Sequence, residues 1–335
     1  MRKQRVLALT MLALLAVAVL PDDGATQAAD KVTLQLKWVT QAQFAGYYAA
    51  KAKGFYTDEK LDVTIRPGGP DIVPEQVVAG GGAQFGIDWL PSLLSARDQG
   101  APLTNIAQVF AYSGMREIAF KTSGIRGPGD LRGRKVAVWF GGNEFELLAT
   151  LEKYKIDRNR DLTLVQQPFD MNLLLQRRVD AAAAMTYNEY KQVLDSGVKP
   201  EALVVIDFNR EGTAMLEDGI FARADWLRDA KNKALAARFL RASLQGWEHC
   251  RDQASECVEI VLKESPVLGR DHQTWMMTEV NKLVWGPPAP KSPLGKMDPQ
   301  AFKQTADIAH KFGVIKKAAD AGAYTHEIWE MAQNK

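Results

Sequence analysis

The stretch KVAVWFGGNEFELLATLEKY, residues 135–154, contains the corner that decides the fold. An apolar run ends at Trp139, two glycines follow, and apolar residues then recur at helical spacing from Phe145 onward. This pattern predicts a buried strand that turns directly into a helix. Glycine at such a turn lets the backbone approach a ligand closely, and the N–H groups at the start of a helix attract polar groups. We therefore expect this corner to contact a ligand.

The same strand–helix unit recurs along the chain. Strand patterns cover residues 32–38, 61–65, 84–89 and 103–110 in the first part, and 135–140, 162–167, 180–186 and 202–208 in the second. Helical patterns separate them, and this alternation predicts right-handed crossovers and mostly parallel sheets. Residues 218–223 are typical of a return strand. The chain from Asp225 onward is helical, apart from the proline-rich stretch WGPPAPKSP, residues 285–293.

These elements predict an α/β protein of two doubly wound lobes, with the second lobe inserted into the first. We expect lobe 1 to comprise residues 29–119 plus 220–335 and lobe 2 residues 120–219, with crossings near 119–122 and 209–220. Two crossings form a hinge, so the lobes would close on each other like a clamp. Because ligands of doubly wound sheets bind beyond the carboxyl ends of the strands, we predict a ligand site between the lobes.

The composition excludes several functional classes. Of the 335 residues, 42 are lysine or arginine and 40 are aspartate or glutamate, which gives a net charge of +2. Nucleic acid or an anionic membrane would favour a larger positive excess, so neither partner is expected. The sequence contains no motif with the spacing of metal ligands, of a nucleotide-binding loop or of a hydrolase nucleophile. We therefore predict a monomeric binding protein without catalytic activity, cofactor or metal.

The N-terminus has the layout of a secretory signal peptide. Arg2, Lys3 and Arg5 precede an uncharged apolar run over residues 6–20, and a polar segment of small residues follows. The run is shorter than the ~20 apolar residues that span a bilayer. We expect residues 1–28 to be removed and the mature protein to work in the periplasm. An uncleaved membrane anchor is the alternative.

Cys250 and Cys257 are the two cysteines of the chain. On one unbroken helix they would lie ~10 Å apart at 1.5 Å per residue, which is too far for a disulfide. The residues between them, RDQASE, carry a helix-break signal in which Ser255 is a good N-cap. Two helices that meet at this corner would bring the sulfur atoms together, and an oxidising compartment would permit the bond. The sequence leaves both arrangements open.

Four predicted strand ends place an aromatic residue beside a polar one. The pairs are Lys37 with Trp38, Asp88 with Trp89, Trp139 with Asn143 and Glu144, and Tyr187 with Asn188 and Glu189. Aromatic faces stack on a planar ring, at about 0.5–1.5 kcal/mol beyond burial, and carboxylates and amides pair with ring nitrogens and amino groups. The predicted ligand is therefore a flat nitrogen heterocycle. Its predicted contacts are Trp38, Gln41, Tyr47, Asp88, Trp89, Trp139, Gly142, Asn143, Glu144, Glu146, Tyr187 and Glu189.

Several of these residues also have structural alternatives. A tryptophan at a strand end often belongs to the core, Asn143 is equally suited to be a plain N-cap, and Glu144 and Glu146 would complement a helix dipole. In an enzyme, Asp88, Glu144 and Glu189 would serve as acid–base pairs, although no nucleophile stands out in the sequence. The repetition of the pairing at four corners favours ligand binding.

The sequence resembles a known superfamily over essentially the whole mature chain. The resemblance is carried by residues 35–65, which begin QLKW and end LDVTI, by VVAGGGAQFGIDW at 77–89, and by GRKVAVWFGGNEFEL at 133–147. These segments resemble the periplasmic-binding-protein superfamily that contains aliphatic-sulfonate-binding and thiamine-pyrimidine-precursor proteins. The resemblance implies a type II periplasmic-binding-protein fold that delivers its ligand to an ABC permease at the inner membrane. It implies a formylamino- or hydroxymethyl-pyrimidine as the first ligand and riboflavin as the second.

The sequence is also similar to an enzyme branch of this superfamily, the yeast-type thiamine pyrimidine synthases. That resemblance implies a lysine for pyridoxal phosphate where this chain has Asp88, and a sacrificial histidine where it has Ser92. It also implies a cysteine-rich iron motif at residues 211–221, where this chain has EGTAMLEDGIF without a cysteine. These three differences favour an exported solute-binding protein over an enzyme.

Overall fold

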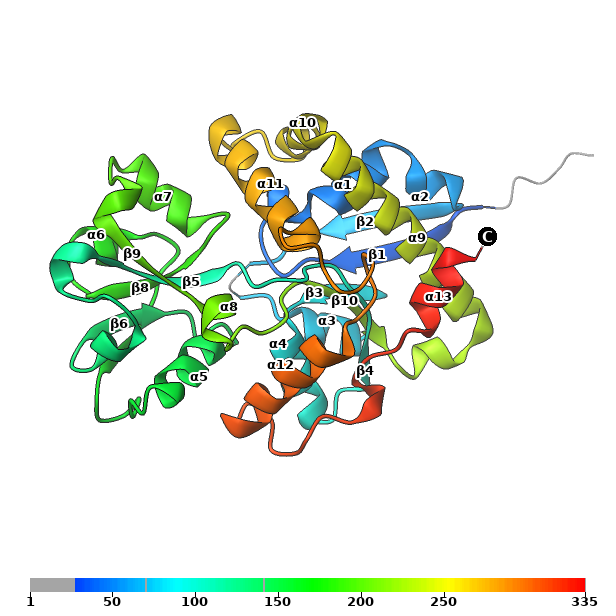
Figure 1. Ribbon diagram of the computed structural model, residues 1–335. Helices are drawn as coiled ribbons and strands as arrows, with labels where there is room; N and C mark the ends of the chain where they lie inside the picture. The colour runs from blue at the N-terminus through cyan, green and yellow to red at the C-terminus, as the bar shows by residue number, and fades with distance from the viewer. Residues whose placement is uncertain (1–27, 70, 141, 335) are drawn as a thin grey trace, which may run out of the picture.

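The computed structural model of the protein describes residues 28–69, 71–140 and 142–334, which form two α/β lobes that lie side by side (Figure 1). The predicted signal peptide falls almost wholly within residues 1–27, outside the described residues. No helix in the described part of the chain combines the length and the apolar character needed to cross a membrane.

Lobe 1 is built on a five-stranded sheet in the order β2-β1-β3-β10-β4. Its strands are β1 (Asp30–Gln35), β2 (Leu61–Arg66), β3 (Phe85–Asp88), β4 (Leu103–Gln108) and β10 (Gly219–Arg223). β1 runs parallel to β2 and β3, with Val32 opposite Val63, whereas β10 runs antiparallel to β3 and β4. The return strand predicted at residues 218–223 therefore lies inside the sheet of lobe 1.

Lobe 2 repeats this topology in a sheet with the order β7-β6-β8-β5-β9. Its strands are β5 (Met115–Phe120), β6 (Lys135–Val138), β7 (Thr163–Gln166), β8 (Ala181–Met185) and β9 (Leu203–Asp207). β6 is parallel to β7 and β8, and β5 is antiparallel to β8 and β9. Each lobe thus combines parallel strands with one antiparallel strand, and the predicted α/β fold class is confirmed.

Helices pack on the faces of both sheets (Figure 1). Those between the strands are α1 (Ala45–Ala52), α2 (Phe55–Asp58), α3 (Pro74–Ala79), α4 (Leu90–Asp98), α5 (Phe145–Lys153), α6 (Asn172–Leu175), α7 (Glu189–Asp195) and α8 (Phe208–Glu211). The C-terminal helices are α9 (Ala230–Asp252), α10 (Ala254–Glu264), α11 (Arg270–Trp285), α12 (Pro299–Lys311) and α13 (Glu327–Gln333). The C-terminal helices complete lobe 1.

Helix α9 runs through the core of lobe 1. The carboxylate of Asp229 caps its first turn by accepting a hydrogen bond from the backbone N–H of Lys231 at 2.7 Å. Its buried face carries Phe239, which stacks on Phe85 with ring centroids 4.1 Å apart. At its C-terminus the chain turns into α10, so Cys250 and Cys257 approach to a Cα–Cα distance of 5.5 Å and form a disulfide.

The two crossings between the lobes lie at residues 109–114 and 212–218. The first begins earlier than the predicted 119–122, because Met115–Phe120 forms β5 and pairs within the sheet of lobe 2. Both faces of β5 are buried there: Met115 and Ala119 pack in one apolar cluster, and Ile118 and Phe120 in another. Residues 115–119 therefore belong structurally to lobe 2.

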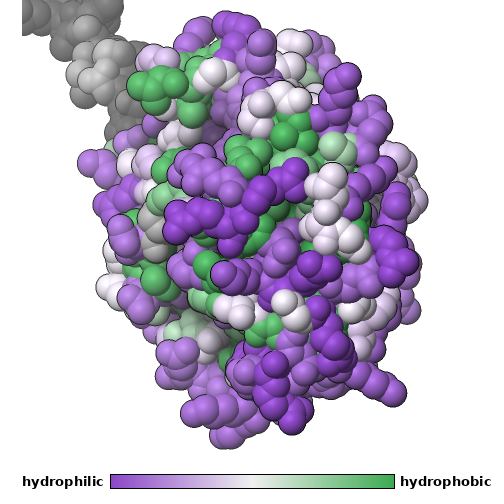
Figure 2. Space-filling view, turned by 90° about the vertical axis from the view of Figure 1, so that its left-hand side faces the viewer, coloured by the Kyte–Doolittle hydropathy of each residue, from purple (hydrophilic) through white to green (hydrophobic). Residues whose placement is uncertain are grey.

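Lobe 2 presents a mostly hydrophilic outer end to the solvent. Figure 2 views the molecule from this end and shows apolar side chains only in small groups among polar ones. Such a surface is typical of a protein region that faces water rather than a large apolar partner.

Candidate ligand-binding site

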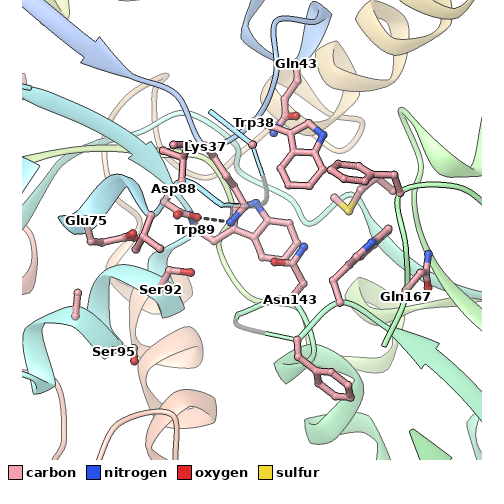
Figure 3. Close-up of a pocket in the computed structure, with 18 of the residues that line it drawn as sticks. Lys37, Trp38, Gln43, Glu75, Asp88, Trp89, Ser92, Ser95, Asn143 and Gln167 are labelled. Atoms are coloured by element: carbon pink, nitrogen blue, oxygen red, sulfur yellow. Dashed lines mark hydrogen bonds and ion pairs between the residues drawn. The ribbon is translucent and has the colours of Figure 1, made fainter. Parts of the chain in front are cut away.

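A cavity of about 720 Å³ lies between the two lobes (Figure 3). Its walls are the segments that follow β1 and β3 in lobe 1, those that follow β6, β7 and β8 in lobe 2, and helix α3. The carboxyl ends of parallel strands meet at this place, which is where doubly wound folds bind ligands. The volume lies within the range of about 300–1,000 Å³ that is usual for small-molecule sites.

Most of the predicted contact residues line this cavity. Those that do are Trp38, Gln41, Asp88, Trp89, Trp139, Asn143, Tyr187 and Glu189. They come from four strand ends that are far apart in the sequence. Parallel strands of each sheet end at the same edge, and the two edges face each other across the cavity. The repeated pairing of aromatic and polar residues is therefore gathered in one place.

At the mouth of the cavity, two aromatic rings meet across the cleft. Trp38 follows β1 in lobe 1 and Phe169 follows β7 in lobe 2, and their ring centroids are 5.1 Å apart. Beside them the indole N–H of Trp139 donates to the carbonyl oxygen of Pro168 at 3.1 Å, which fixes the segment that carries Phe169. More than half of the Phe169 side chain is exposed. This part of the cavity is suited to cover the face of a flat ring.

An ion pair forms part of the cavity wall on lobe 1. Lys37 Nζ lies 2.5 Å from Asp88 Oδ1 and 5.1 Å from the ring centroid of Trp89. Asp88 Oδ1 also accepts a hydrogen bond from the backbone N–H of Trp89 at 2.6 Å. Burial is the largest single effect and would lower the pKa of Lys37, but the charge and hydrogen bond of Asp88, with the charges of Glu75 and Asp218, together outweigh it and raise this pKa above its usual value. Lys37 therefore stays an ammonium.

Behind this pair, two glutamines connect the cavity to the second crossing. Gln41 Nε2 donates to Gln43 Oε1 at 2.7 Å, and Gln43 Nε2 donates to Asp218 Oδ2 at 2.8 Å. Burial raises the pKa of Asp218 to about 7, although the bond from Gln43 and the charge of Lys37 oppose it. The chain of amides thus joins the cavity wall to the hinge segment at residues 212–218.

On lobe 2, Glu189 stands at the first turn of α7. Its Oε2 accepts a hydrogen bond from the backbone N–H of Met185 at 3.0 Å, and its Oε1 accepts one from Asn188 Nδ2 at 2.7 Å. Burial raises the pKa of Glu189 to about 7 in spite of these bonds. Near neutral pH this carboxyl can therefore donate or accept a hydrogen bond toward the cavity.

Tyr47 and Glu146, two of the predicted contacts, lie away from the cavity. Tyr47 is buried in the core of lobe 1, with its ring edge-on to Trp247 at 5.6 Å between centroids, because α1 turns this position toward α9. Glu146 is buried beside the crossings, where its Oε1 accepts from the backbone N–H of Met215 at 2.6 Å. Both roles depend on partners far away in the sequence.

Gly142 and Glu144 shape the corner after β6 instead of lining the cavity. Glu144 Oε2 accepts a hydrogen bond from the backbone N–H of Gly142 at 2.8 Å, so the acid stabilises the turn before α5. Gly142 has φ +139°, a conformation that favours glycine, and a Cβ placed there would lie 2.8 Å from Ser92 Oγ of lobe 1. The glycine thus permits a close approach of the two lobes.

Several cavity residues were not among the predicted contacts. They include Lys37, Gln43, Glu75, Ser92, Gln167 and Phe169. Phe169 follows the strand pattern at 162–167, so the same rule of aromatic residues at strand ends would have found it. Glu75 stands in the first turn of α3, where an acidic residue is a common helix feature and gives no separate signal.

The site does not match the cofactors of the synthase branch. Within residues 28–69, 71–140 and 142–334, no group of three or more histidines, cysteines, aspartates or glutamates is placed to hold a metal ion. Both cysteines are joined in the disulfide. Asp88 and Ser92 stand where the resemblance to that branch implies lysine and histidine, and the ammonium of Lys37 is held by Asp88.

Comparison with known proteins identifies a family and several relatives. The profile of a family described as NMT1/THI5 like matches residues 41–256. The riboflavin-binding protein RibY of Chloroflexus aurantiacus is 25% identical over 319 residues, which cover 92% of this chain and 88% of that protein. The formylaminopyrimidine-binding protein of Halalkalibacterium halodurans is 22% identical over 289 residues, 83% of this chain and 84% of that protein.

An enzyme is also among the relatives. A 4-amino-5-hydroxymethyl-2-methylpyrimidine phosphate synthase of Legionella pneumophila is 26% identical over 259 residues, 71% of this chain and 75% of that protein. Among solved structures, the periplasmic aliphatic sulphonate binding protein SsuA of Escherichia coli superimposes with a TM-score of 0.66 at 16% identity. The match covers 87% of this chain and 90% of that one. The two-lobed architecture is therefore that of the periplasmic binding proteins, as expected.

Proposed function

The chain belongs to the NMT1/THI5-like family, and from this premise we propose that it is an exported solute-binding protein that delivers a flat nitrogen heterocycle to an ABC permease. The observation that carries the proposal is the cavity between the lobes, in which indole rings alternate with carboxyl and amide groups. A ring bound there would be stacked by aromatic faces and oriented by hydrogen bonds at its edge. Closure of the lobes over the ligand would create the form that docks on the permease.

The charge of the cavity favours a neutral or basic ligand over an anion. Among the cavity-lining residues that the structure describes, Lys37 alone is a lysine or arginine, whereas Glu75, Asp88 and Glu189 are acidic. Lys37 is already paired with Asp88. A sulfonate would therefore find no unpaired lysine or arginine among these residues, and its desolvation would be poorly compensated. The similarity to sulfonate-binding proteins thus extends to the fold and not to this ligand.

Our first candidate ligand is a thiamine pyrimidine precursor, a formylamino- or hydroxymethyl-pyrimidine. The relative that is named for formylaminopyrimidine binding supports this class. The carboxyl of Glu189, which titrates near pH 7, is suited to pair with an amino group and a ring nitrogen.

Riboflavin is the second candidate, because the cavity offers room for more than a single ring. Its volume of about 720 Å³ and its three indoles, Trp38, Trp89 and Trp139, would accommodate a fused ring system. The relative named for riboflavin binding supports this alternative.

Binding rather than catalysis is proposed, since the residues that the synthase branch requires are replaced. We expect that the purified protein, supplied with pyridoxal phosphate and iron(II), forms no pyrimidine product detectable by mass spectrometry. The formation of product would restore the enzyme interpretation.

The function is tested by the small molecule that accompanies the protein. We expect mass spectrometry of protein purified from its own periplasm, denatured to release the ligand, to show a pyrimidine or a flavin. Tryptophan fluorescence of the stripped protein should then change on addition of that compound and not of an alkanesulfonate. An unchanged spectrum with pyrimidines, riboflavin and sulfonates alike would contradict the proposal. Size-exclusion chromatography and cell fractionation test the expected monomer and its periplasmic location.

A further inference from the structure

One carboxyl in the cavity wall lies against a second carboxyl and keeps one oxygen without a partner. Glu75 stands in the first turn of α3, only 2% of its surface is exposed, and its Oε1 makes no hydrogen bond. It lines the cavity together with Lys37 and Asp88, and Figure 3 shows its side chain directed toward Asp88. A buried polar oxygen without a hydrogen-bond partner destabilises the folded state. Glu75 Oε1 is therefore open to a hydrogen-bond donor that arrives with the ligand.

The charges around Glu75 leave this wall with an excess of acceptors. Asp88 on β3 and Lys37 after β1 form an ion pair at 2.5 Å, so the single ammonium is already engaged with one of the two carboxyl groups. Asp218, behind the wall, is a further acid that is bonded to Gln43. Burial and the neighbouring charge of Asp88 raise the pKa of Glu75 well above its ordinary range, and Lys37 only partly opposes this. Because Lys37 is paired with only one of the two buried carboxyls, the empty cavity favours the protonated form of Glu75.

We propose that Glu75, supported by the Lys37–Asp88 pair, is a specificity-determining residue that selects ligands carrying an exocyclic amine beside a ring nitrogen. This inference rests on the proposed function and narrows its ligand class. The amine would donate to the carboxyl oxygens of Glu75 and Asp88. The ring nitrogen would accept a hydrogen bond from the protonated carboxyl of Glu75, while Lys37 stays paired with Asp88.

Ligand binding at Glu75 needs no further reactant to account for its protons. A neutral ring nitrogen that takes the proton of Glu75 becomes a cation beside the new carboxylate, and no proton is exchanged with the buffer. A ligand that is already protonated forms the same complex, and the proton of Glu75 then leaves to the buffer. In both cases the bound state contains an ion pair in place of a lone buried acid.

The same wall would discriminate against the second candidate ligand. The imide edge of a flavin presents one N–H between two carbonyl oxygens, so its acceptors would face the carboxylate of Asp88. A sulfonate would bring only acceptors and a negative charge. The amino-pyrimidine class is therefore favoured at this subsite.

The experiment compares two ligands that differ in one group. Isothermal titration measures the affinity of the stripped protein for 4-amino-5-hydroxymethyl-2-methylpyrimidine and for its 4-oxo counterpart. We expect the wild type to prefer the amine at least tenfold and Glu75→Gln to lose this preference, because a glutamine amide serves amine and carbonyl equally well. The same titration is then repeated at a pH below the pKa of the ligand, in two buffers of different ionisation enthalpy. The difference between the two binding heats gives the number of protons that binding releases to the buffer. This count should fall in the variant.

Asp71→Asn is the matched control, since Asp71 is exposed on the same segment and does not line the cavity. It should preserve both the preference and the proton count, and thermal unfolding verifies that Glu75→Gln is folded. A preference that survives in Glu75→Gln overturns the role of Glu75. Equal binding of both pyrimidines, or binding of riboflavin alone, by the wild type overturns the inference and leaves the proposed function standing. If the wild type binds no heterocycle, both are overturned.

Discussion

Trp38 of lobe 1 contacts Phe169 of lobe 2 across the cleft. Trp38 is only half-buried, so it contributes less to the core than a fully enclosed indole would. Its position after β1 leaves one face available to a ring that enters the cavity. A substitution of Trp38 should therefore affect ligand binding and lobe closure without a large effect on folding stability.

We expect Trp38→Ala to weaken binding of the heterocycle at least tenfold, which corresponds to about 1.4 kcal/mol. The midpoint of thermal unfolding should change little, because the side chain is half-exposed. Trp329→Ala serves as a control, since Trp329 packs near Leu294, outside the cavity. Titration calorimetry provides the affinities. Unchanged affinity in Trp38→Ala would return this residue to a purely structural role.

Gly142 illustrates how a backbone conformation can require one residue type. Its φ of +139° lies where side chains are strained, so we expect Gly142→Ala to lower the free energy of unfolding by about 1–3 kcal/mol. Urea denaturation measures this loss. Adding Ser92→Ala should not restore stability, because the serine hydroxyl can already rotate away from the new methyl group. Full recovery of stability in the double variant would show that the contact with Ser92, and not the backbone conformation, causes the loss.

Helix α9 packs on α1 at a distance that only glycine allows. A Cβ at Gly246 would lie 1.9 Å from the carbonyl oxygen of Gly46 and 2.8 Å from the backbone nitrogen of Ala50. Two helices that approach so closely bury the apolar residues around them efficiently. The disulfide between Cys250 and Cys257 then holds α10 against the end of the same helix.

We expect Gly246→Ala to destabilise the protein by about 3 kcal/mol, as overpacking of a tight contact does. The sign of the change in stability distinguishes a tight contact from helix propensity, because a glycine-to-alanine exchange inside an exposed helix stabilises a protein by about 1 kcal/mol. Gly127→Ala is the control: Gly127 is extended, and no atom lies within 4 Å of an added Cβ. Chemical denaturation compares the two variants. A Gly246→Ala protein as stable as the wild type would contradict the close packing of α1 and α9.

The hinge of the whole molecule contains a buried group of carboxyls. Ser113 of the first crossing lies 2.8 Å from Glu217 Oε1 of the second crossing and 2.9 Å from Glu146 Oε2 of α5. Its oxygen also accepts from the backbone N–H of Met115 at 3.0 Å. A hydroxyl has one proton and can donate to only one of the two carboxyls. The other carboxyl must carry a proton to complete the network.

Stability should therefore fall as the pH rises. Burial raises the pKa of Glu146 to about 8 and that of Glu217 well above its ordinary range, so the folded protein holds protons that the unfolded chain releases near pH 4.3. The contribution of these protonated carboxyls to the free energy of unfolding is complete below about pH 4 and is lost as the pH rises through about 8. We expect the free energy of unfolding, measured in urea at several pH values, to decrease from pH 5 to pH 8.

Glu146→Gln should flatten this dependence, because an amide cannot ionise, whereas Glu201→Gln at an exposed site should not. Glu189 and Asp218, whose pKa values burial raises to about 7, act in the same direction, so part of the slope should remain in Glu146→Gln. A stability that is constant or increases over this window would contradict the protonated hinge.

The α/β class, the repeated strand–helix corners and the return strand at residues 218–223 could be predicted from the sequence, because they follow from local periodicity and turn residues. The sequence also identified eight side chains of the cavity, since strand ends share one edge in a parallel sheet. The tertiary structure alone decided that β5 belongs to lobe 2, that Tyr47 turns into the core, and that Glu146 enters the hinge. Those outcomes depend on partners tens to hundreds of residues away, and a local pattern carries no information about which distant group will share a buried space with it.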